Sequence, residues 1–161
     1  MESTEMTAEI VKEIRKTCVF IGVFSAVFVL MYIGVVLIIK NTFIFFIGLM
    51  PSMDKTLLRL IFYVLSASLM GVLFFIRRRR FSSKSLSAKS NDVISLIKYV
   101  MNTVIWSMAL ALGPAISGFF IFALGNLLYD FLVLSAISFI AIYINVPAKA
   151  WLELKLFTSL S

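Results

Sequence analysis

Few residues of this chain could carry out chemistry, and their types restrict that chemistry sharply. The 161 residues include no histidine and a single cysteine, Cys18. Zinc sites built from Cys and His, disulfides within the chain, and haem held by histidine or a CxxCH motif are therefore excluded. We expect Asp54 and Asp130 to be solvated carboxylates at the edge of a membrane. The sequence predicts no catalytic residue, no cofactor and no metal site.

The composition indicates that the elements around these residues lie in a membrane. Hydrophobic residues make up 61% of the chain and the mean hydropathy is +1.06, whereas soluble domains contain about 45–50% apolar residues. The net charge of +7 would suit a nucleic-acid partner if the basic residues covered one face of a soluble fold. Because they lie between apolar runs instead, we expect a single-domain, all-α, multi-pass protein of a bacterial inner membrane, with no nucleic-acid partner.

Runs without charged residues define the first two predicted spans. The 23 uncharged residues between Lys16 and Lys40 would reach about 35 Å as a helix, enough to cross a hydrocarbon core of about 30 Å. We expect this first span, 17–39, to be retained, because no cleavage pattern of small residues follows it. The second run is shorter, and Arg59 is expected to extend toward the headgroups so that the span covers 56–76.

The remaining apolar stretch predicts two more spans. The 31 uncharged residues from Tyr99 to Tyr129 are too many for one ordinary span. Gly125-Asn126 offers a turn, so the third span is predicted at 99–124 and the fourth at 131–146. The short link between them requires an antiparallel hairpin.

The distribution of Lys and Arg predicts the orientation. Twelve of them flank one side of the predicted spans and three flank the other, and cytoplasmic segments carry the excess. The chain is therefore expected to form two antiparallel hairpins, N-in and C-in. The predicted connecting segments are a cytoplasmic amphipathic tail (1–16), an external loop (40–55), a basic cytoplasmic loop (77–98), an external turn (125–130) and a cytoplasmic interfacial tail (147–161).

Two segments allow more than one interpretation. The N-terminal tail carries an apolar stripe on a short helix, which fits an extension of the first span, a membrane-surface helix or a helix that docks a partner. The apolar residues 42–50 are too few to cross the bilayer. They predict an interfacial or re-entrant segment, or a helical extension of the first span.

The basic stretch RRRRFSSKSLSAKS, which begins at Arg77, is the strongest charged motif. It could fix the topology alone, or it could also bind anionic headgroups or a partner. Trp151 is expected to anchor the C-terminal tail at the membrane interface. The predicted headgroup or topology residues are Arg77, Arg78, Arg79, Arg80, Lys84 and Lys89.

Small residues recur at four-residue intervals within the spans. Such rows let helix backbones approach closely in lipid, where no hydrophobic force drives association. They are predicted to pack against a neighbouring span or another protein. Pro114 is predicted to bend the third span, since it removes a backbone donor. The predicted helix-packing residues are Gly22, Ala26, Ala67, Gly71, Ala109, Gly113 and Ser117.

Residues 109–131, ALALGPAISGFFIFALGNLLYDF, resemble the second helix of the proteolipid (c-type) subunits of rotary ATP synthases. They also resemble small bacterial four-span membrane proteins that share an Ala-Ile-x-Gly run. In proteolipids a carboxylate just before this run carries the ion, whereas Leu112 and Gly113 stand there in this chain. The resemblance therefore implies a hairpin-shaped packing unit of a larger membrane complex, without ion binding.

Two functions follow as expectations. The first is a noncatalytic accessory, assembly or structural subunit of a membrane complex, whose partners are the lipid bilayer and other subunits or further copies of the chain. The second is a small oligomeric transporter or channel subunit, with Asn102, Ser107 and Pro114 lining a path. Intramembrane ionisable residues, which usually mark proton or ion carriers, are not predicted inside the spans.

The predicted orientation can be tested by labelling introduced cysteines. A cysteine at Ser52 should react with a membrane-impermeant thiol reagent added outside cells, and a cysteine at Ser83 should not, because the basic loop is retained inside. Equal labelling of both positions from one side would contradict the predicted topology.

Overall fold

Helices make up nearly all of the described chain. A computed structural model describes residues 2–43, 45–80 and 93–146, and the helices are α1 (Glu2–Thr42), α2 (Lys55–Arg80), α4 (Val93–Ala111), α5 (Gly113–Gly125) and α6 (Leu128–Asn145). Within these ranges, four helical stretches are long and apolar enough to cross a membrane. They are Val11–Thr42, Lys55–Arg80, Ile97–Gly125 and Leu128–Asn145.

Two helices continue beyond the predicted spans. The N-terminal tail is part of α1, which runs unbroken from Glu2 to Thr42. The four arginines at 77–80 form the last turn of α2 instead of lying in the following loop. Arginine has a high helix propensity, and cations at a helix C-terminus interact favourably with its dipole. Lys84, Lys89 and Trp151 lie outside the described residues.

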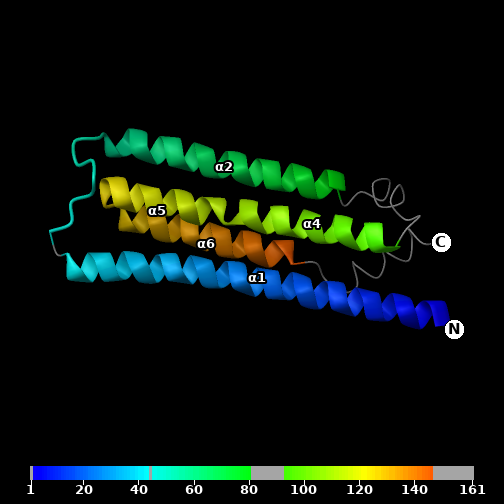
Figure 1. Cartoon of the computed structure of the whole chain (residues 1–161). Helices are drawn as coiled ribbons and strands as arrows, with labels where there is room; N and C mark the ends of the chain where they lie inside the picture. The colour runs from blue at the N-terminus through cyan, green and yellow to red at the C-terminus, as the bar shows by residue number, and fades with distance from the viewer. Residues whose placement is uncertain (1, 44, 81–92, 147–161) are drawn as a thin grey trace.

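The third predicted span consists of α4 and α5, which lie end to end (Figure 1). Their hydrogen bonding continues across the junction, because the Leu112 N–H donates to Met108 O at 3.2 Å and the Ile116 N–H donates to Leu112 O at 3.1 Å. Pro114, in the first turn of α5, has no N–H to donate. The Ala115 N–H turns instead to Ser138 Oγ of α6, at 2.8 Å. A buried serine thus satisfies an amide that an unbroken helix would have paired internally.

The helices α1 and α2 lie on opposite sides of a central pair, which consists of the α4–α5 stretch and α6. The most extensive interhelical contact is between α5 and α6, while α1 packs mainly on α6 and α4, and α2 on α5 and α4. Figure 1 shows α2 and α1 on either flank of α4–α5 and α6. Two neighbouring rings of α5 reflect this arrangement: Phe119 lies against Tyr32 of α1, and Phe120 stacks on Phe62 of α2.

This arrangement adds the relative placement of the two hairpins, which the sequence did not predict. The first and second spans are antiparallel, but the second hairpin lies between them. The connection from residue 43 to residue 54 contains 12 residues, which can extend to about 40 Å. It is therefore long enough to pass over the end of the central pair.

A close approach of α5 to α6 uses a glycine that the predicted rows left out. A Cβ on Gly118 would lie 3.1 Å from Leu134 Cβ and 3.1 Å from Phe131 O, both in α6. Its neighbour Ser117 is buried. Gly113 is half-buried and faces Leu69 of α2. Gly118 therefore serves the contact of α5 with α6, and Gly113 serves the contact of α5 with α2.

The other predicted small residues differ in how far they are buried. Gly22 is buried against Val146 and Met108, and Ala26 is half-buried. Ala109 is exposed on α4. The Ala67 and Gly71 row faces outward from α2, and nothing lies within 4 Å of a Cβ placed on Gly71. The buried stripe of α2 runs instead through Leu58, Ser66 and Leu73.

Substituting alanine for Gly118 should destabilise the bundle, because the new Cβ meets backbone of α6 that cannot move independently. We expect a loss of about 1–3 kcal/mol. The matched change Gly71→Ala places its Cβ in open space and should leave stability unchanged or raise it by up to about 1 kcal/mol. Unfolding in mixed micelles, followed by circular dichroism, measures both. Equal effects would contradict the close α5–α6 contact.

Candidate functional site

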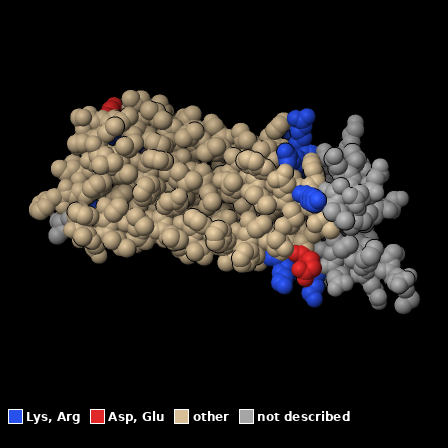
Figure 2. Space-filling model, viewed as in Figure 1, with Lys and Arg blue, Asp and Glu red and all other residues tan. Residues whose placement is uncertain are grey.

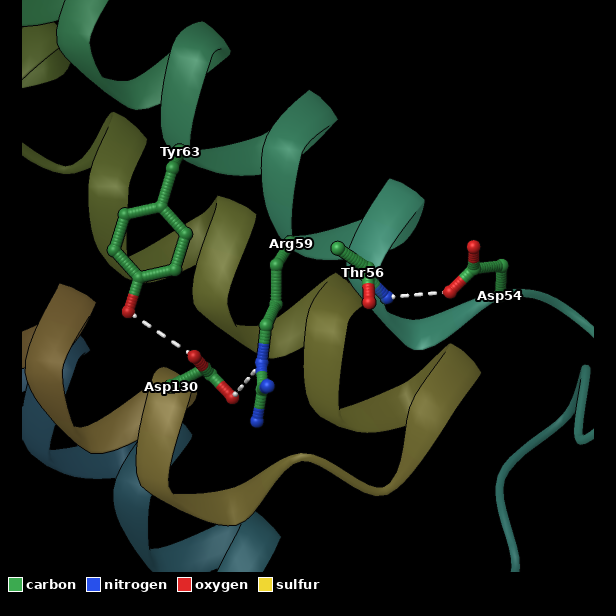
Figure 3. A network of polar contacts seen from close by, with 5 residues as sticks. All are labelled: Asp54, Thr56, Arg59, Tyr63 and Asp130. Carbon is green, nitrogen blue, oxygen red and sulfur yellow. Dashed lines mark hydrogen bonds and ion pairs between the residues drawn. The ribbon is translucent and has the colours of Figure 1, made fainter.

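The strongest polar cluster joins the beginnings of α2 and α6. Arg59 and Tyr63 lie one turn apart on α2, and Asp130 lies in the first turn of α6. Arg59 Nε donates to Asp130 Oδ2 at 3.0 Å, and Tyr63 Oη donates to Asp130 Oδ1 at 3.2 Å. Figure 3 shows both α2 side chains pointing at the carboxylate. Each oxygen of Asp130 thus has a donor from α2.

Burial is unequal across this ion pair. The Asp130 side chain is 8% exposed, whereas the Arg59 side chain is 49% exposed. The positive end of the α6 dipole also favours an anion at Asp130, because this residue lies in the first turn. A buried carboxylate with both oxygens engaged is suited to holding two helices together. Of the two partners, Asp130 depends more on the contact, since it has little access to solvent.

The cluster corrects one expectation. Asp130 was expected to be a solvated carboxylate, but the structure buries it. Arg59, which was expected to extend toward the headgroups, donates its Nε to Asp130 while its side chain stays 49% exposed. The physical reason is that α2 and α6 begin at the same end of the bundle. A signal was present in the sequence: Arg59 and Tyr63 share one helix face, and a carboxylate stands at the same predicted membrane edge.

Asp54 has a different role from Asp130. It directly precedes α2, and its Oδ1 accepts a hydrogen bond from the Thr56 N–H at 2.8 Å (Figure 3). An aspartate in this position satisfies an N-terminal amide that has no partner within the helix. Asp54 is exposed, so it caps α2 at the surface.

A second polar contact at the same end is centred on Asn126. Its backbone is left-handed, with φ 55° and ψ 35°, and its N–H closes α5 by donating to Phe122 O at 2.7 Å. The side chain donates from Nδ2 to Phe46 O at 2.6 Å and accepts from Lys40 Nζ at 3.4 Å. One residue therefore connects the end of α5 with the end of α1 and with the following loop.

The loop after α1 folds over the carboxyl end of α5. The Leu49 N–H donates to Ala123 O at 2.9 Å, and the Met50 N–H donates to Leu124 O at 3.0 Å. These amides satisfy carbonyls that have no partner within the helix. Gly48, at φ +100°, passes so close that a Cβ would lie 2.5 Å from Leu124 O. The apolar segment 42–50 thus caps α5, and only its first residue extends α1.

The opposite end of α2 carries a matching contact to α6. Arg77 Nη1 donates to Ile144 O at 2.6 Å, in the last turn of α6. The Arg80 guanidinium lies over the Tyr99 ring of α4, 5.8 Å from its centroid. Arg59 and Arg77 are 18 residues apart on α2, or about 27 Å. Both ends of α2 are therefore tied to α6 by arginine.

The three residues proposed to line a path differ in burial. Ser107 is buried in α4 and Pro114 is buried in α5, but Asn102 is exposed. Among the described residues, the hydroxyls of Ser107 and Ser135 are buried without a hydrogen-bond partner. In the same ranges, no three His, Cys, Asp or Glu side chains gather as a metal site would require.

Comparison with known proteins does not identify the chain. No protein family, curated protein or solved structure matches it. The resemblance of residues 109–131 to proteolipid subunits therefore stays a prediction. The site must be judged from its own contacts.

Removing Arg59 should destabilise the bundle more than removing its partner. Arg59→Gln leaves the buried Asp130 with Tyr63 alone, and we expect a loss of about 2 kcal/mol. Asp130→Asn leaves a half-exposed guanidinium that can be solvated, so its cost should be about 1 kcal/mol. Unfolding in mixed micelles measures both changes.

Two further variants complete this test. The double variant Arg59→Gln/Asp130→Asn should lose less than the sum of the single losses, because the two residues are coupled. Lys55→Gln removes a cation one turn earlier on α2 and should cost no more than about 0.5 kcal/mol. Additive losses, or a Lys55 effect as large as that of Arg59, would show that the ion pair does not hold α2.

Proposed function

We infer that this chain is a noncatalytic structural subunit that spans the membrane four times, N-in and C-in, and assembles with other membrane proteins or further copies of itself. The uneven burial of its helices carries the proposal. In their most apolar stretches, 22% of α1 and 17% of α2 is buried within the chain, against 50% for α4–α5 and 44% for α6. The flanking helices thus offer broad apolar faces on opposite sides.

The interior supports a structural role. Large side chains fill the central pair, with Phe122, Phe131 and Leu134 fully buried. The strongest described polar contacts join one helix to another, as Arg59 and Arg77 do with α6. These groups stabilise the bundle and are not directed at a ligand. Binding to other molecules would therefore use the outer surface of the bundle.

One part of that surface allows close approach of another helix. Ala67 and Gly71 are exposed one turn apart on α2. Small residues at this spacing let helix backbones come close in lipid, where packing drives association. The outer face of α2 is therefore the proposed assembly face.

Copurification from native membranes in mild detergent tests the proposal. The chain should isolate with a stoichiometric partner or as an oligomer, and Gly71→Leu should reduce that association because it fills the small-residue row. Gly34→Leu is the matched control, since Gly34 of α1 also has nothing within 4 Å of a Cβ but lies outside the row. A chain that always isolates alone as a monomer would contradict the proposal.

A small oligomeric transporter or channel subunit is the alternative. The junction between α4 and α5, where the Ala115 N–H bonds Ser138 instead of a helix carbonyl, favours it, because irregular helices often form substrate sites in transporters. The unpartnered hydroxyls of Ser107 and Ser135 would add polar groups inside the bundle. Flux into liposomes, compared between the natural chain and Pro114→Leu, separates the two functions. Absence of flux in every reconstituted form would remove the alternative.

A further inference from the structure

Five exposed basic side chains from three helices lie near the end of the bundle that carries the N-terminus. Lys12, Arg15 and Lys16 belong to α1, Arg78 to α2 and Lys98 to α4. Figure 2 shows Lys and Arg gathered where the long uncharged surface ends. These five residues are called the basic belt below.

The belt residues differ from the other arginines at the end of α2. Arg77 is engaged by α6 and Arg80 by α4, and Arg79 already has an interaction partner. Within the described ranges, the five belt side chains have no hydrogen bond or ion pair. Their charges are therefore available to a ligand from outside the chain.

Packing fixes the direction in which α1 presents its charges. Val11, Ile14 and Cys18 are buried on one side of the helix, at 0–3% exposure. This stripe sets the rotation of α1, so Lys12 and Arg15 project from its remaining surface. The cations are thus positioned by the fold and not by a mobile tail.

The local charge balance favours an anionic ligand. Glu13 is the one carboxylate among the described side chains at this end, against the five cations of the belt. The other acidic residues of the N-terminal segment, Glu2, Glu5 and Glu9, precede Lys12 by three or more residues in the sequence.

The depth of the belt matches the headgroup region of a bilayer. The uncharged stretch between Lys16 and Lys40 is 23 residues, or about 35 Å as a helix, against a hydrocarbon core of about 30 Å. When Lys40 lies at one interface, Lys16 lies at the other. Ammonium and guanidinium groups at that level donate well to phosphate oxygens.

We propose that the basic belt binds the phosphate groups of acidic phospholipids at this end of the bundle. This rests on the membrane-embedded part of the proposed function and is independent of assembly with a partner. Cations spread over three helices fit several small headgroups. A long polyanion such as nucleic acid would need a continuous track on one face.

Lipid selectivity in reconstituted bilayers tests the proposal. The full chain is placed in phosphatidylcholine bilayers containing a trace of spin-labelled phosphatidylglycerol or spin-labelled phosphatidylcholine, and electron paramagnetic resonance gives the fraction of each held by the protein. The natural chain should prefer the acidic lipid on the order of fivefold. Both leaflets have the same composition, so the orientation of insertion does not affect the result.

Charge-neutral variants identify the residues responsible. Replacing all five belt residues by glutamine should reduce the preference to about one, and a milder variant, Lys12→Gln/Lys16→Gln/Lys98→Gln, should give an intermediate value. The matched control Lys40→Gln/Lys55→Gln removes cations at the opposite end and should keep at least half of the preference. Circular dichroism verifies that each variant is folded.

The outcomes are distinct. An unchanged preference in either folded belt variant overturns the proposal, and so does loss of preference in the control variant alone. Glycerol phosphate should lower the preference no more than sodium chloride of equal ionic strength; a larger effect would assign the belt to soluble phosphate compounds. Displacement of the acidic lipid by a DNA oligonucleotide at that ionic strength would assign it to nucleic acid. A chain that does not enter bilayers would overturn the proposed function as well.

Discussion

Two arginines of α2 reach α6 at opposite ends of the bundle, in addition to the packing of α2 on α5 and α4. The two helices share little packing, yet Arg59 pairs with Asp130 and Arg77 binds Ile144 O. In an apolar surrounding, a charged or polar group without a partner is costly. Contacts about 27 Å apart therefore tie both ends of α2 to α6 and add to its packing on α5 and α4.

The cost of leaving a polar group without a partner also explains the contacts at the helix ends and beside Pro114. Carbonyls at the end of α5 are satisfied by the loop after α1, and Asn126 connects that loop to α5 and Lys40. Within the bundle, Ser138 accepts the Ala115 N–H beside Pro114. These polar groups thus serve contacts between elements, whereas the outer faces of α1 and α2 are apolar and exposed.

The sequence predicted the helices better than their arrangement. Uncharged runs such as 17–39 indicated spans because charge is excluded from hydrocarbon, and this is a local property of the chain. The partner of Asp130 is not local, since Arg59 is 71 residues away. The order of the flanking helices also depends on contacts between distant segments, such as Tyr32 with Phe119. Gly118 was missed because the predicted four-residue row passes through Ser117 and not through its neighbour.

Disulfide trapping in native membranes tests the placement of α2 beside α5 most directly. In a Cys18→Ser background, Leu69→Cys/Gly113→Cys should cross-link on mild oxidation, because a Cβ on Gly113 lies 3.6 Å from Leu69 Cβ, within the range of disulfides. Ala26 lies at the same depth on α1, six residues before Tyr32 as Gly113 is before Phe119. Leu69→Cys/Ala26→Cys should not cross-link, because the central pair separates α1 from α2. Trapping of the second pair without the first would contradict the account.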